Sequence, residues 1–506
     1  MAEFLNAAAV ILARGERLGD RTALIADGIP VSYAGLLRLV SKAANAITTL
    51  GAERGASVGL MLKDSALNCA AFLGTVRAGA VAIPMNPWLA SADYAHMAAE
   101  SGMRLVIADE EFMPALEQAS AETAPRRHGL YRLYTREQFA GAVAQAGDVH
   151  ETAATQAGDP AFWLFSSGTT GRPKGIIHSQ AGLACSGKLL RETVRGDEHT
   201  RMLCTSKHFF AFGLENGLLG PLAIGGTAII NSGRPDAQAV AGQTELLHPD
   251  CLFTVPTFFR RLLALPPGQL AALRGVRHFY TGGERLPDAL ASQWRAATGA
   301  DLHVCYGMSE TYANASANFP GQIRAGSIGR PLANVETRLL DAGGLPVAAG
   351  QPGTLWLKHP SLALRYANPE ATARAFRDGW FCTNDVCAMD HDGYLYHQGR
   401  TDELLKVAGQ WVKPSDAEEA ALGDARIREA ACVVVPDRDG FERLALFVVC
   451  TPPGEGEAAA RARVERLATH SRPKWVREVS DIPKTATGKI QRFRLREQLL
   501  EELDRL

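Results

Sequence analysis

The chain lacks the features that mark several common classes of protein. Its nine cysteines include no CxxC pair, which argues against a disulfide framework and against a zinc site. Lysine and arginine total 53 against 54 aspartates and glutamates, so no excess of positive charge points to nucleic acid or to an anionic membrane. The N-terminus lacks the basic start of a secretory signal, and no apolar run is long enough to cross a bilayer. These absences predict a cytoplasmic protein with reduced thiols.

Short apolar segments alternate with helical stretches through the first part of the chain. With 506 residues, the chain is too long for one core, and we expect at least two domains. Segments such as Ser57–Met61, Ala80–Pro84 and Leu105–Ala108 are apolar throughout, and the pattern recurs at Gly225–Ile230 and Cys251–Val255. Uniformly apolar strands separated by helices indicate parallel sheets that are buried on both faces.

The later part of the chain has a different texture. From about Gly321 the segments are shorter and richer in glycine and proline, which indicates a mostly antiparallel β subdomain. After Arg400 a compact α+β unit follows, with a hairpin at Leu404–Lys413 and a helix that starts at Pro414. No low-complexity linker separates the two parts, so a short hinge is expected between them.

These patterns predict an α/β fold of two domains. The large N-terminal domain, residues 1–399, is expected to hold two parallel-type sheets with helices and the β subdomain. The small α+β domain, residues 400–506, is expected to be mobile about a hinge at 400–403.

A loop of hydroxyls and glycines follows one of the apolar strands. Residues 163–175 read WLFSSGTTGRPKG, and glycines let successive N–H groups point at one centre, where they bind an anion. Lys174 adds a point charge suited to phosphate. The spacing differs from GxxxxGK[ST], which argues against an ordinary P-loop, and a solvated turn is the alternative. The candidate phosphate-binding residues are Ser166, Ser167, Gly168, Thr169, Thr170, Gly171 and Lys174.

Five further stretches follow the phosphate loop in a characteristic order. They are Gly282-Gly283-Glu284, the YGMSET run at 306–311, Asn384-Asp385 with Asp392-Gly393-Tyr394, Gly399-Arg400-Thr401-Asp402, and the PKTATGKI run at 483–490. Any one of them alone is weak evidence. Together, over almost the whole chain, the six stretches resemble the motifs of the AMP-forming acyl and aryl ligases, a branch of the adenylate-forming enzymes.

The resemblance implies a reaction in two steps. A carboxylate first attacks the α-phosphate of ATP, which gives an acyl-adenylate and pyrophosphate, and a thiol then displaces AMP. Because the attacking group and the phosphate are both anionic, catalysis consists mostly of positioning and of positive charge placed where negative charge gathers.

The resemblance also assigns roles to residues of these motifs. Glu310 matches the ligand of Mg²⁺, which prefers oxygen donors shared with phosphate. Ser309 stands where the family usually has threonine and should hydrogen-bond the α-phosphate. Asp385 matches the ribose ligand, although an aspartate in such a turn is otherwise solvated. Arg400 should reach the ribose or a phosphate.

Two more motifs complete the implied nucleotide site. Tyr306 presents a ring on which adenine could stack, but Cys305 replaces the usual asparagine or aspartate, so base selectivity is less defined. Gly282, Gly283 and Glu284 belong to the implied nucleotide-binding set. Lys489 matches the catalytic lysine of the small domain, which bridges the attacking carboxylate and the α-phosphate.

The second half-reaction requires the small domain to rotate in the resembling family. Asp402 matches the position of the hinge. Gly409 and Trp411 match a loop that lines the pantetheine tunnel, where glycine permits close approach of the thiol arm. A solvated hairpin tip is the alternative for this loop.

The run KHFFAFGLENG at 207–217 resembles the acyl-pocket helix of benzoate-type ligases. Aromatic side chains at this density could form a flat slot for an aryl ring, although plain core packing is an equal alternative for each. Phe210 occupies the family's gating aromatic position. Glu215, if buried, needs a partner, which a substrate amino or hydroxyl group or a protein side chain could supply. The predicted pocket residues are Phe209, Phe210, Ala211, Phe212, Glu215, Tyr280, Gly307 and Met308.

The sequence therefore predicts an aryl-CoA ligase that uses ATP, Mg²⁺ and CoA. Its expected substrate is benzoate or an amino- or hydroxy-substituted benzoate. A stand-alone enzyme that loads the phosphopantetheine of a separate carrier protein is the alternative, and a non-catalytic ligand-binding relative is a third possibility. Oligomeric state is not predicted.

Overall fold

The computed structural model describes residues 4–123, 131–167, 172–401, 405–407, 410–437, 440–484 and 490–504. The chain forms two compact units. The first comprises Met1–Thr337, Trp356–Cys382 and Asp392–Leu395, and the second comprises Arg338–Leu355, Thr383–His391 and Tyr396–Leu506. The predicted division between residues 399 and 400 stays a prediction. No described helix is both long and apolar enough to cross a membrane.

One seven-stranded sheet of the first unit carries the predicted phosphate loop. Its order is β18 (Arg365–Tyr366), β8 (Pro173–Ser179), β7 (Pro160–Ser167), β4 (Val81–Pro84), β3 (Ser57–Met61), β5 (Leu105–Ala108) and β6 (Arg132–Thr135). Strands β7, β4, β3, β5 and β6 run parallel, whereas β8 is antiparallel to both β7 and β18. The predicted loop therefore joins the antiparallel pair β7 and β8 rather than a strand and a helix.

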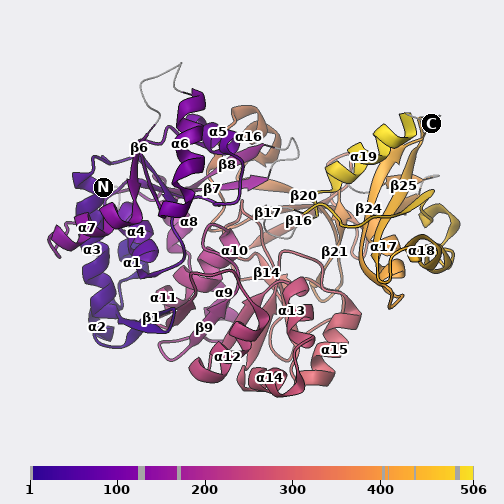
Figure 1. Ribbon diagram of the computed structural model, residues 1–506, viewed down its shortest axis with the longest axis horizontal. Helices are drawn as coiled ribbons and strands as arrows, with labels where there is room; N and C mark the ends of the chain where they lie inside the picture. Colours follow the sequence, from indigo (N-terminus) through magenta and orange to yellow (C-terminus); the bar gives the residue numbers. More distant parts are fainter. Residues whose placement is uncertain are drawn as a thin grey trace. The chain divides into compact units, whose positions relative to one another are not determined.

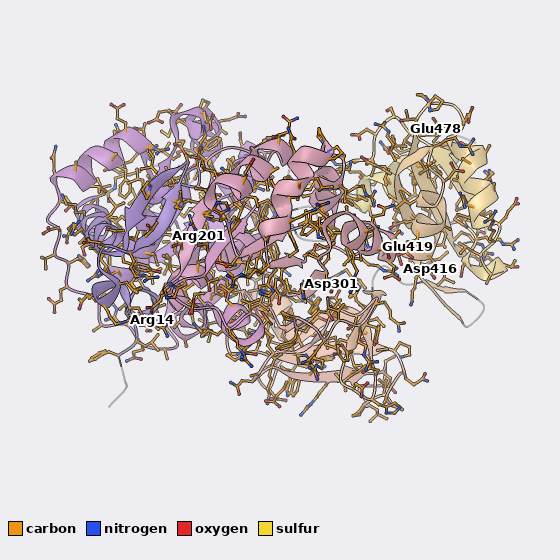
Figure 2. All side chains as sticks on the ribbon, turned by 90° about the horizontal axis from the view of Figure 1, so that it is seen from below. Arg14, Arg201, Asp301, Asp416, Glu419 and Glu478 are labelled. Carbon is orange, nitrogen blue, oxygen red and sulfur yellow. The ribbon has the colours of Figure 1, made fainter. Side chains whose placement is uncertain are left out.

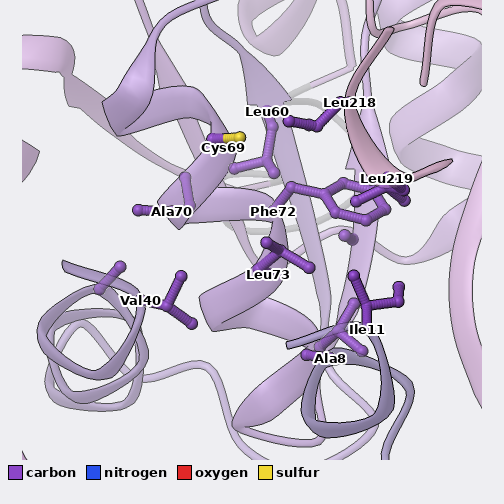
Figure 3. Close-up of a cluster of buried hydrophobic side chains, with 14 of the residues drawn as sticks. Ala8, Ile11, Val40, Leu60, Cys69, Ala70, Phe72, Leu73, Leu218 and Leu219 are labelled. Carbon is purple, nitrogen blue, oxygen red and sulfur yellow. The ribbon is translucent and has the colours of Figure 1, made fainter. Parts of the chain in front are cut away.

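Helices cover both faces of this sheet (Figure 1). One face packs against α1 (Ala7–Ile11), α3 (Tyr33–Thr49) and α4 (Ala66–Arg77), and the other against α5 (Ser91–Ser101) and α6 (Met113–Thr123). Figure 3 shows Phe72 and Leu73 of α4 beside Leu60 of β3, with Leu218 and Leu219 of a later segment in the same cluster. Burial on both faces is the reason that β3, β4 and β5 are apolar throughout.

A nine-stranded sheet forms the rest of the first unit's core. Its order is β15 (Arg330–Pro331), β14 (Ser316–Ala317), β13 (Leu302–Tyr306), β12 (His278–Thr281), β11 (Cys251–Thr254), β9 (Arg201–Cys204), β10 (Thr227–Ile230), β1 (Thr22–Ala26) and β2 (Ile29–Ser32). The run from β13 to β1 is parallel. Helices α12 (Ala237–Leu247), α13 (Pro256–Leu263) and α15 (Asp288–Thr298) pack on one face. The two predicted parallel-type sheets are confirmed.

The segment predicted as an acyl-pocket helix starts later than expected. Helix α10 covers only Ala211–Leu214, continues as a π-helical turn, η2 (Glu215–Leu219), and ends as α11 (Gly220–Ile224). Residues 207–210 instead form a turn in which the Phe210 N–H donates to the Lys207 carbonyl at 3.0 Å. A β-carbon on Gly213 would lie 2.2 Å from that same carbonyl oxygen, so this turn packs directly on the helix and glycine is required there.

The later β segments form a five-stranded sheet of β16 (Glu336–Leu340), β17 (Gly353–Lys358), β20 (Trp380–Met389), β19 (Phe376–Arg377) and β21 (Leu395–Arg400). In the second unit, β24 (Ile427–Pro436) and β25 (Glu442–Cys450) are antiparallel, and β26 (Trp475–Glu478) runs parallel to β25. Its helices are α17 (Pro414–Leu422), α18 (Gly456–Val464) and α19 (Arg492–Asp504). The predicted small α+β unit is confirmed.

Charged residues stabilise the ends of elements in this unit. Pro414 occupies the first position of α17 and Asp416 its first turn, where negative charge is favoured. Glu478 ends β26, and its carboxylate accepts N–H bonds from Gly454 at 2.7 Å and from Gly456 at 2.6 Å (Figure 2). The predicted hairpin is present as β22 (Leu405–Val407) and β23 (Gln410–Val412).

Candidate active site

Three side chains of the first unit meet at the end of the predicted phosphate loop. The ammonium Nζ of Lys174 lies 3.3 Å from Oε1 of Glu310. The hydroxyl of Tyr366 donates to the same oxygen at 2.8 Å. Nζ of Lys174 also lies 3.7 Å from the centroid of the Tyr366 ring, within the range of a cation–π interaction. The structure thus brings together two predicted residues, Lys174 and Glu310, with a third that the sequence did not reveal.

Strand pairing positions this cluster. Tyr366 of β18 pairs with Ile176 of β8, two residues after Lys174. Glu310 is attached to the segment just before β18, because its carbonyl accepts the N–H of Ala363 at 2.8 Å. The ring of Tyr366 packs edge-on against Phe376, with centroids 5.4 Å apart. Residues from three distant segments are therefore fixed against one another by backbone bonds.

Buried histidines hold the backbone around Ser309 and Thr311. His178 Nε2 bonds the Ser309 carbonyl at 2.9 Å, and burial lowers the pKa of His178 to about 3. His359 Nε2 bonds the Asn314 carbonyl at 3.1 Å, and burial lowers its pKa to about 4. Since a carbonyl only accepts, Nε2 of each ring carries the proton, and the lowered pKa values keep both rings neutral. Ser309 therefore lies on a backbone that neutral donors hold in place.

Glu215 is buried against protein groups. Its Oε1 accepts the N–H of Gly187 at 2.8 Å, and Glu215 is only 1% exposed. Burial raises the pKa of Glu215, whereas the Gly187 N–H, the hydroxyls of Tyr312 and Ser186, and the charge of Arg191 oppose the rise. The protein thus supplies the Gly187 N–H to Oε1, whereas the buried Oε2 has no geometric hydrogen bond among the described residues. A contact between Glu215 and a substrate group stays a prediction.

The neighbouring residue, Asn216, links two segments of the candidate site. The amide Nδ2 of Asn314 donates to Oδ1 of Asn216 at 3.0 Å, and Nδ2 of Asn216 donates to the Phe212 carbonyl at 2.9 Å. Both asparagines are buried. Neither was predicted, because single asparagines carry no sequence signal that distinguishes such a pair from turn residues.

The predicted aromatic set separates into two clusters. Phe209 packs edge-on against Trp88 and Phe210, with centroids 5.5 and 4.4 Å away. Phe212 instead contacts Phe253, whose ring stacks on Tyr280 at 4.9 Å.

Two glycines of the nucleotide motifs lie so close to neighbouring groups that a side chain would collide with them. A β-carbon on Gly282 would lie 3.2 Å from the Phe212 ring and 2.7 Å from the Cys305 carbonyl. One on Gly307 would lie 3.2 Å from Cα of Asn314. Tyr280, 0% exposed, is a core residue of this cluster.

The structure places the remaining predicted residues of the first unit at the ends of strands and helices or in the cluster around Tyr366. Gly283 adopts a φ of +80° between β12 and Glu284, and Tyr306 ends β13. Ala211 begins α10. Met308 packs on the cluster around Tyr366. The backbone of Ser166 pairs with that of Lys174 across β7 and β8.

The second unit contains a separate cluster around Asp385. Oδ1 of Asp385 lies 3.3 Å from Nε2 of His397 and 3.5 Å from Nη1 of Arg400. Asp385 belongs to β20, and His397 and Arg400 belong to β21, so adjacent strands place them together. The predicted pair Asp385 and Arg400 is thus in contact, and His397 is an additional member that the motifs did not mark.

Several predicted residues fall outside what the structure describes. Gly168, Thr169, Thr170, Gly171, Asp402, Gly409 and Lys489 are not among the described residues. Ser167 and Trp411 are described by their backbone pairing alone, Ser167 with Pro173 and Trp411 with Lys406. The roles expected for these residues stay predictions.

The described residues contain no group of three or more His, Cys, Asp or Glu side chains that could enclose a metal ion. Glu310 nevertheless fits Mg²⁺, because a metal carried mainly by phosphate oxygens and water needs only one or two protein carboxylates. Its side chain is 12% exposed.

Comparison with known proteins places these features in a family. The model of the AMP-binding enzyme family matches residues 12–367, and that of the AMP-binding enzyme C-terminal domain matches residues 416–489. A 3-hydroxybenzoate–CoA ligase of Aromatoleum sp. (strain CIB) is 36% identical, over 96% of this chain and 95% of the relative.

Solved structures agree with the sequence comparison. An anthranilate CoA ligase in complex with anthranoyl-AMP matches with a TM-score of 0.91 and 29% identity, over 99% of each chain. A benzoate CoA ligase from Burkholderia xenovorans LB400 matches with a TM-score of 0.86 and 31% identity, over 97% of this chain and 99% of that one. The chain therefore belongs to the AMP-binding enzyme family, and its resemblance to the AMP-forming aryl-CoA ligases is confirmed.

Proposed function

We propose that the protein is an AMP-forming aryl-CoA ligase that activates benzoate or an amino- or hydroxy-substituted benzoate and transfers the acyl group to CoA. The observation that carries the proposal is the convergence of Lys174 and Glu310 across 136 residues of sequence. A cation and a carboxylate side by side, at the end of a hydroxyl-rich loop, suit a site that binds both a phosphate and a metal ion.

Glu310 is the residue proposed to ligate Mg²⁺. The ion, when bound, neutralises charge on the phosphate oxygens. Lys174 would bind the pyrophosphate-forming phosphates as a point charge, and Ser309 would donate to the α-phosphate. The neutral histidines His178 and His359 support this function by fixing the backbone on either side of Glu310.

Asp385 and Arg400 are proposed to hold the ribose. A carboxylate accepts from both ribose hydroxyls, and the guanidinium beside it keeps the carboxylate charged and oriented. Lys489 is proposed to bridge the attacking carboxylate and the α-phosphate in the first half-reaction. Asp402, Gly409 and Trp411 keep their proposed roles in the hinge and the pantetheine path.

The aromatic acid is assigned by similarity and by the surroundings of Phe212. Relatives named for 3-hydroxybenzoate, benzoate and anthranilate support an aromatic acid with or without a small polar substituent. Phe212 lies beside Gly282 and contacts Phe253, which stacks on Tyr280. Because Phe253 and Tyr280 are buried in the core, Phe212 is the ring of this cluster proposed to face a flat aryl substrate. Glu215 is proposed to support the ring-binding segment, since its Oε1 accepts the N–H of Gly187.

The test is a panel of aromatic acids in ATP–pyrophosphate exchange, followed by thioester formation with and without free CoA. Exchange with benzoate, 3-hydroxybenzoate or 2-aminobenzoate and product only with CoA is the expected result. Exchange without CoA-dependent product would favour transfer to a carrier protein. Absence of exchange with every acid would overturn the proposal and favour a non-catalytic relative.

A further inference from the structure

Tyr366 stands at the centre of the Lys174 and Glu310 contact and has no role in the function proposed above. Its hydroxyl and the ammonium of Lys174 both reach Oε1 of Glu310, at 2.8 and 3.3 Å. The lysine also lies over the tyrosine ring, 3.7 Å from its centroid. One tyrosine therefore contacts a candidate phosphate ligand through its ring and a candidate metal ligand through its hydroxyl.

Of the three residues, Tyr366 is the one that the fold fixes. It is 4% exposed and packs with Ile176, Phe376 and Phe381. Backbone bonds hold both sides of it, since β18 pairs with β8 and the N–H of Ala367 donates to the Gly175 carbonyl at 2.9 Å. The side chain of Lys174, by contrast, is 32% exposed and ends in a freely rotating ammonium. A fixed donor and a movable donor thus share one carboxylate oxygen.

The two donors differ in charge, so a metal ion bound to Glu310 affects them differently. A cation on Glu310 repels the ammonium of Lys174, and phosphate attracts it. The phenol of Tyr366 is uncharged, so it can keep its bond to Oε1 while the other carboxylate oxygen faces a metal ion. Of these two described donors, the tyrosine is the one that can orient Glu310 both before and after the nucleotide binds.

We propose that Tyr366 is a positioning residue for Mg²⁺–ATP. Its hydroxyl holds the Glu310 carboxylate in place while the ammonium of Lys174 leaves Glu310 and binds a phosphate of the nucleotide. The inference rests on the proposed function for the identity of the ligand, and it concerns binding rather than the chemical step. It predicts that removal of the hydroxyl weakens the metal-nucleotide complex without altering the site of the acid.

The test is Tyr366→Phe, which keeps the ring under Lys174 and removes only the hydroxyl. Tyr131→Phe is the matched control, because Tyr131 is also buried and donates a bond of 2.9 Å, to the Leu116 carbonyl. Binding of Mg²⁺–ATP is measured by calorimetry on the full chain, without the acid. We expect Tyr366→Phe to weaken binding about tenfold or more, as for loss of a hydrogen bond to a charged group, and Tyr131→Phe to bind as the parent protein does.

A second measurement separates positioning from a general structural defect. In a Glu310→Ala background, Tyr366→Phe should cause little further loss of Mg²⁺–ATP affinity, because the carboxylate that the Tyr366 hydroxyl positions is already absent. The KM for the aromatic acid should stay unchanged in Tyr366→Phe. Unaltered Mg²⁺–ATP affinity in Tyr366→Phe, or fully additive losses in the double variant, would overturn the inference. Failure of every acid in pyrophosphate exchange would instead overturn the proposed function and leave the binding result standing.

Discussion

Asn314 donates its side-chain amide to Oδ1 of Asn216 at 3.0 Å, inside the first unit and out of contact with bulk water. The bond joins the π-helical turn after Phe212 to the segment that follows Glu310. In the proposed function these two segments hold the aromatic acid and the metal ligand respectively. This pair of uncharged amides thus contributes to their relative position.

Asn314→Ala should weaken this connection. Oδ1 of Asn216 would lose its donor while it stays buried, which costs about 1–3 kcal/mol of unfolding free energy. The KM for the aromatic acid should rise more than the KM for ATP, since the acid lies on the Asn216 side. Chemical unfolding and steady-state kinetics measure the two effects. In the Asn216→Ala, Asn314→Ala double variant, the loss of unfolding free energy should be smaller than the sum of the two single losses. A double-variant loss equal to that sum would mean that the amides act separately.

Lys489→Ala tests the assignment of the two half-reactions. If Lys489 bridges the carboxylate and the α-phosphate, its removal should lower the rate of adenylate formation roughly 10²- to 10³-fold, as for loss of one preorganised donor. Thioester formation from a preformed acyl-adenylate and CoA should survive, because the lysine is absent from that step. Rapid-quench measurement of each half-reaction gives the comparison. An equal fall in both steps would show that Lys489 has a different role.

Glu215→Gln should change how stability depends on pH. Burial raises the pKa of Glu215 above its ordinary value of 4.5, so the folded protein binds a proton more readily than the unfolded chain does. The native protein therefore loses unfolding free energy as the pH rises from about 4 through the raised pKa. The glutamine variant cannot ionise and lacks this loss, so its stability relative to the parent should increase with pH.

Denaturant unfolding of both proteins between pH 4 and pH 8 measures this difference. The comparison of variant with parent removes the opposite contribution of His178, whose lowered pKa acts in the acidic part of the range. A constant difference across the range would show that Glu215 titrates as it does in the unfolded chain. The same variant should keep the parent's preference among benzoate, 3-hydroxybenzoate and 2-aminobenzoate. A changed preference would indicate that Glu215 contacts the aromatic acid.

The sequence sufficed for the sheets and for residues that a motif marks. Uniformly apolar strands such as β3 and β5 predicted buried parallel sheets, and the motifs marked Lys174 and Glu310 as site residues, although not their mutual contact. Tyr366 was missed because its contacts depend on the pairing of β18 with β8. These strands are nearly two hundred residues apart, and no short stretch of sequence indicates that they pair.

The start of the acyl-side helix was placed too early for a related reason. Residues 207–210 have no helix-breaking signal of their own, but the close contact of Gly213 with the Lys207 carbonyl requires a turn there. His397 was missed for the same reason as Tyr366: its partner, Asp385, belongs to another strand. Local patterns predict elements, and contacts between distant strands complete the site.

Asp385→Asn should weaken ATP binding through the second unit. Asp385 faces His397 and Arg400 at 3.3 and 3.5 Å, and its replacement by a neutral amide removes the negative charge beside these side chains and an acceptor for the ribose hydroxyls. We expect the KM for ATP to rise about tenfold or more, since hydrogen bonds to charged groups are worth about 1.5–3 kcal/mol, with little change in the KM for the acid.

Asp437→Asn is the matched control for this prediction. Asp437 is also a buried aspartate of the second unit with two cations, Nε of Arg443 at 3.2 Å and Nζ of Lys474 at 2.9 Å. Lys474 and Arg443, with the Phe441 N–H, hold the pKa of Asp437 down to about 2, so its substitution should lower stability while the KM for ATP stays at the parent value. Equal effects of the two substitutions on the KM for ATP would assign the Asp385 cluster to folding alone, whereas a rise confined to Asp385→Asn would assign it to the nucleotide.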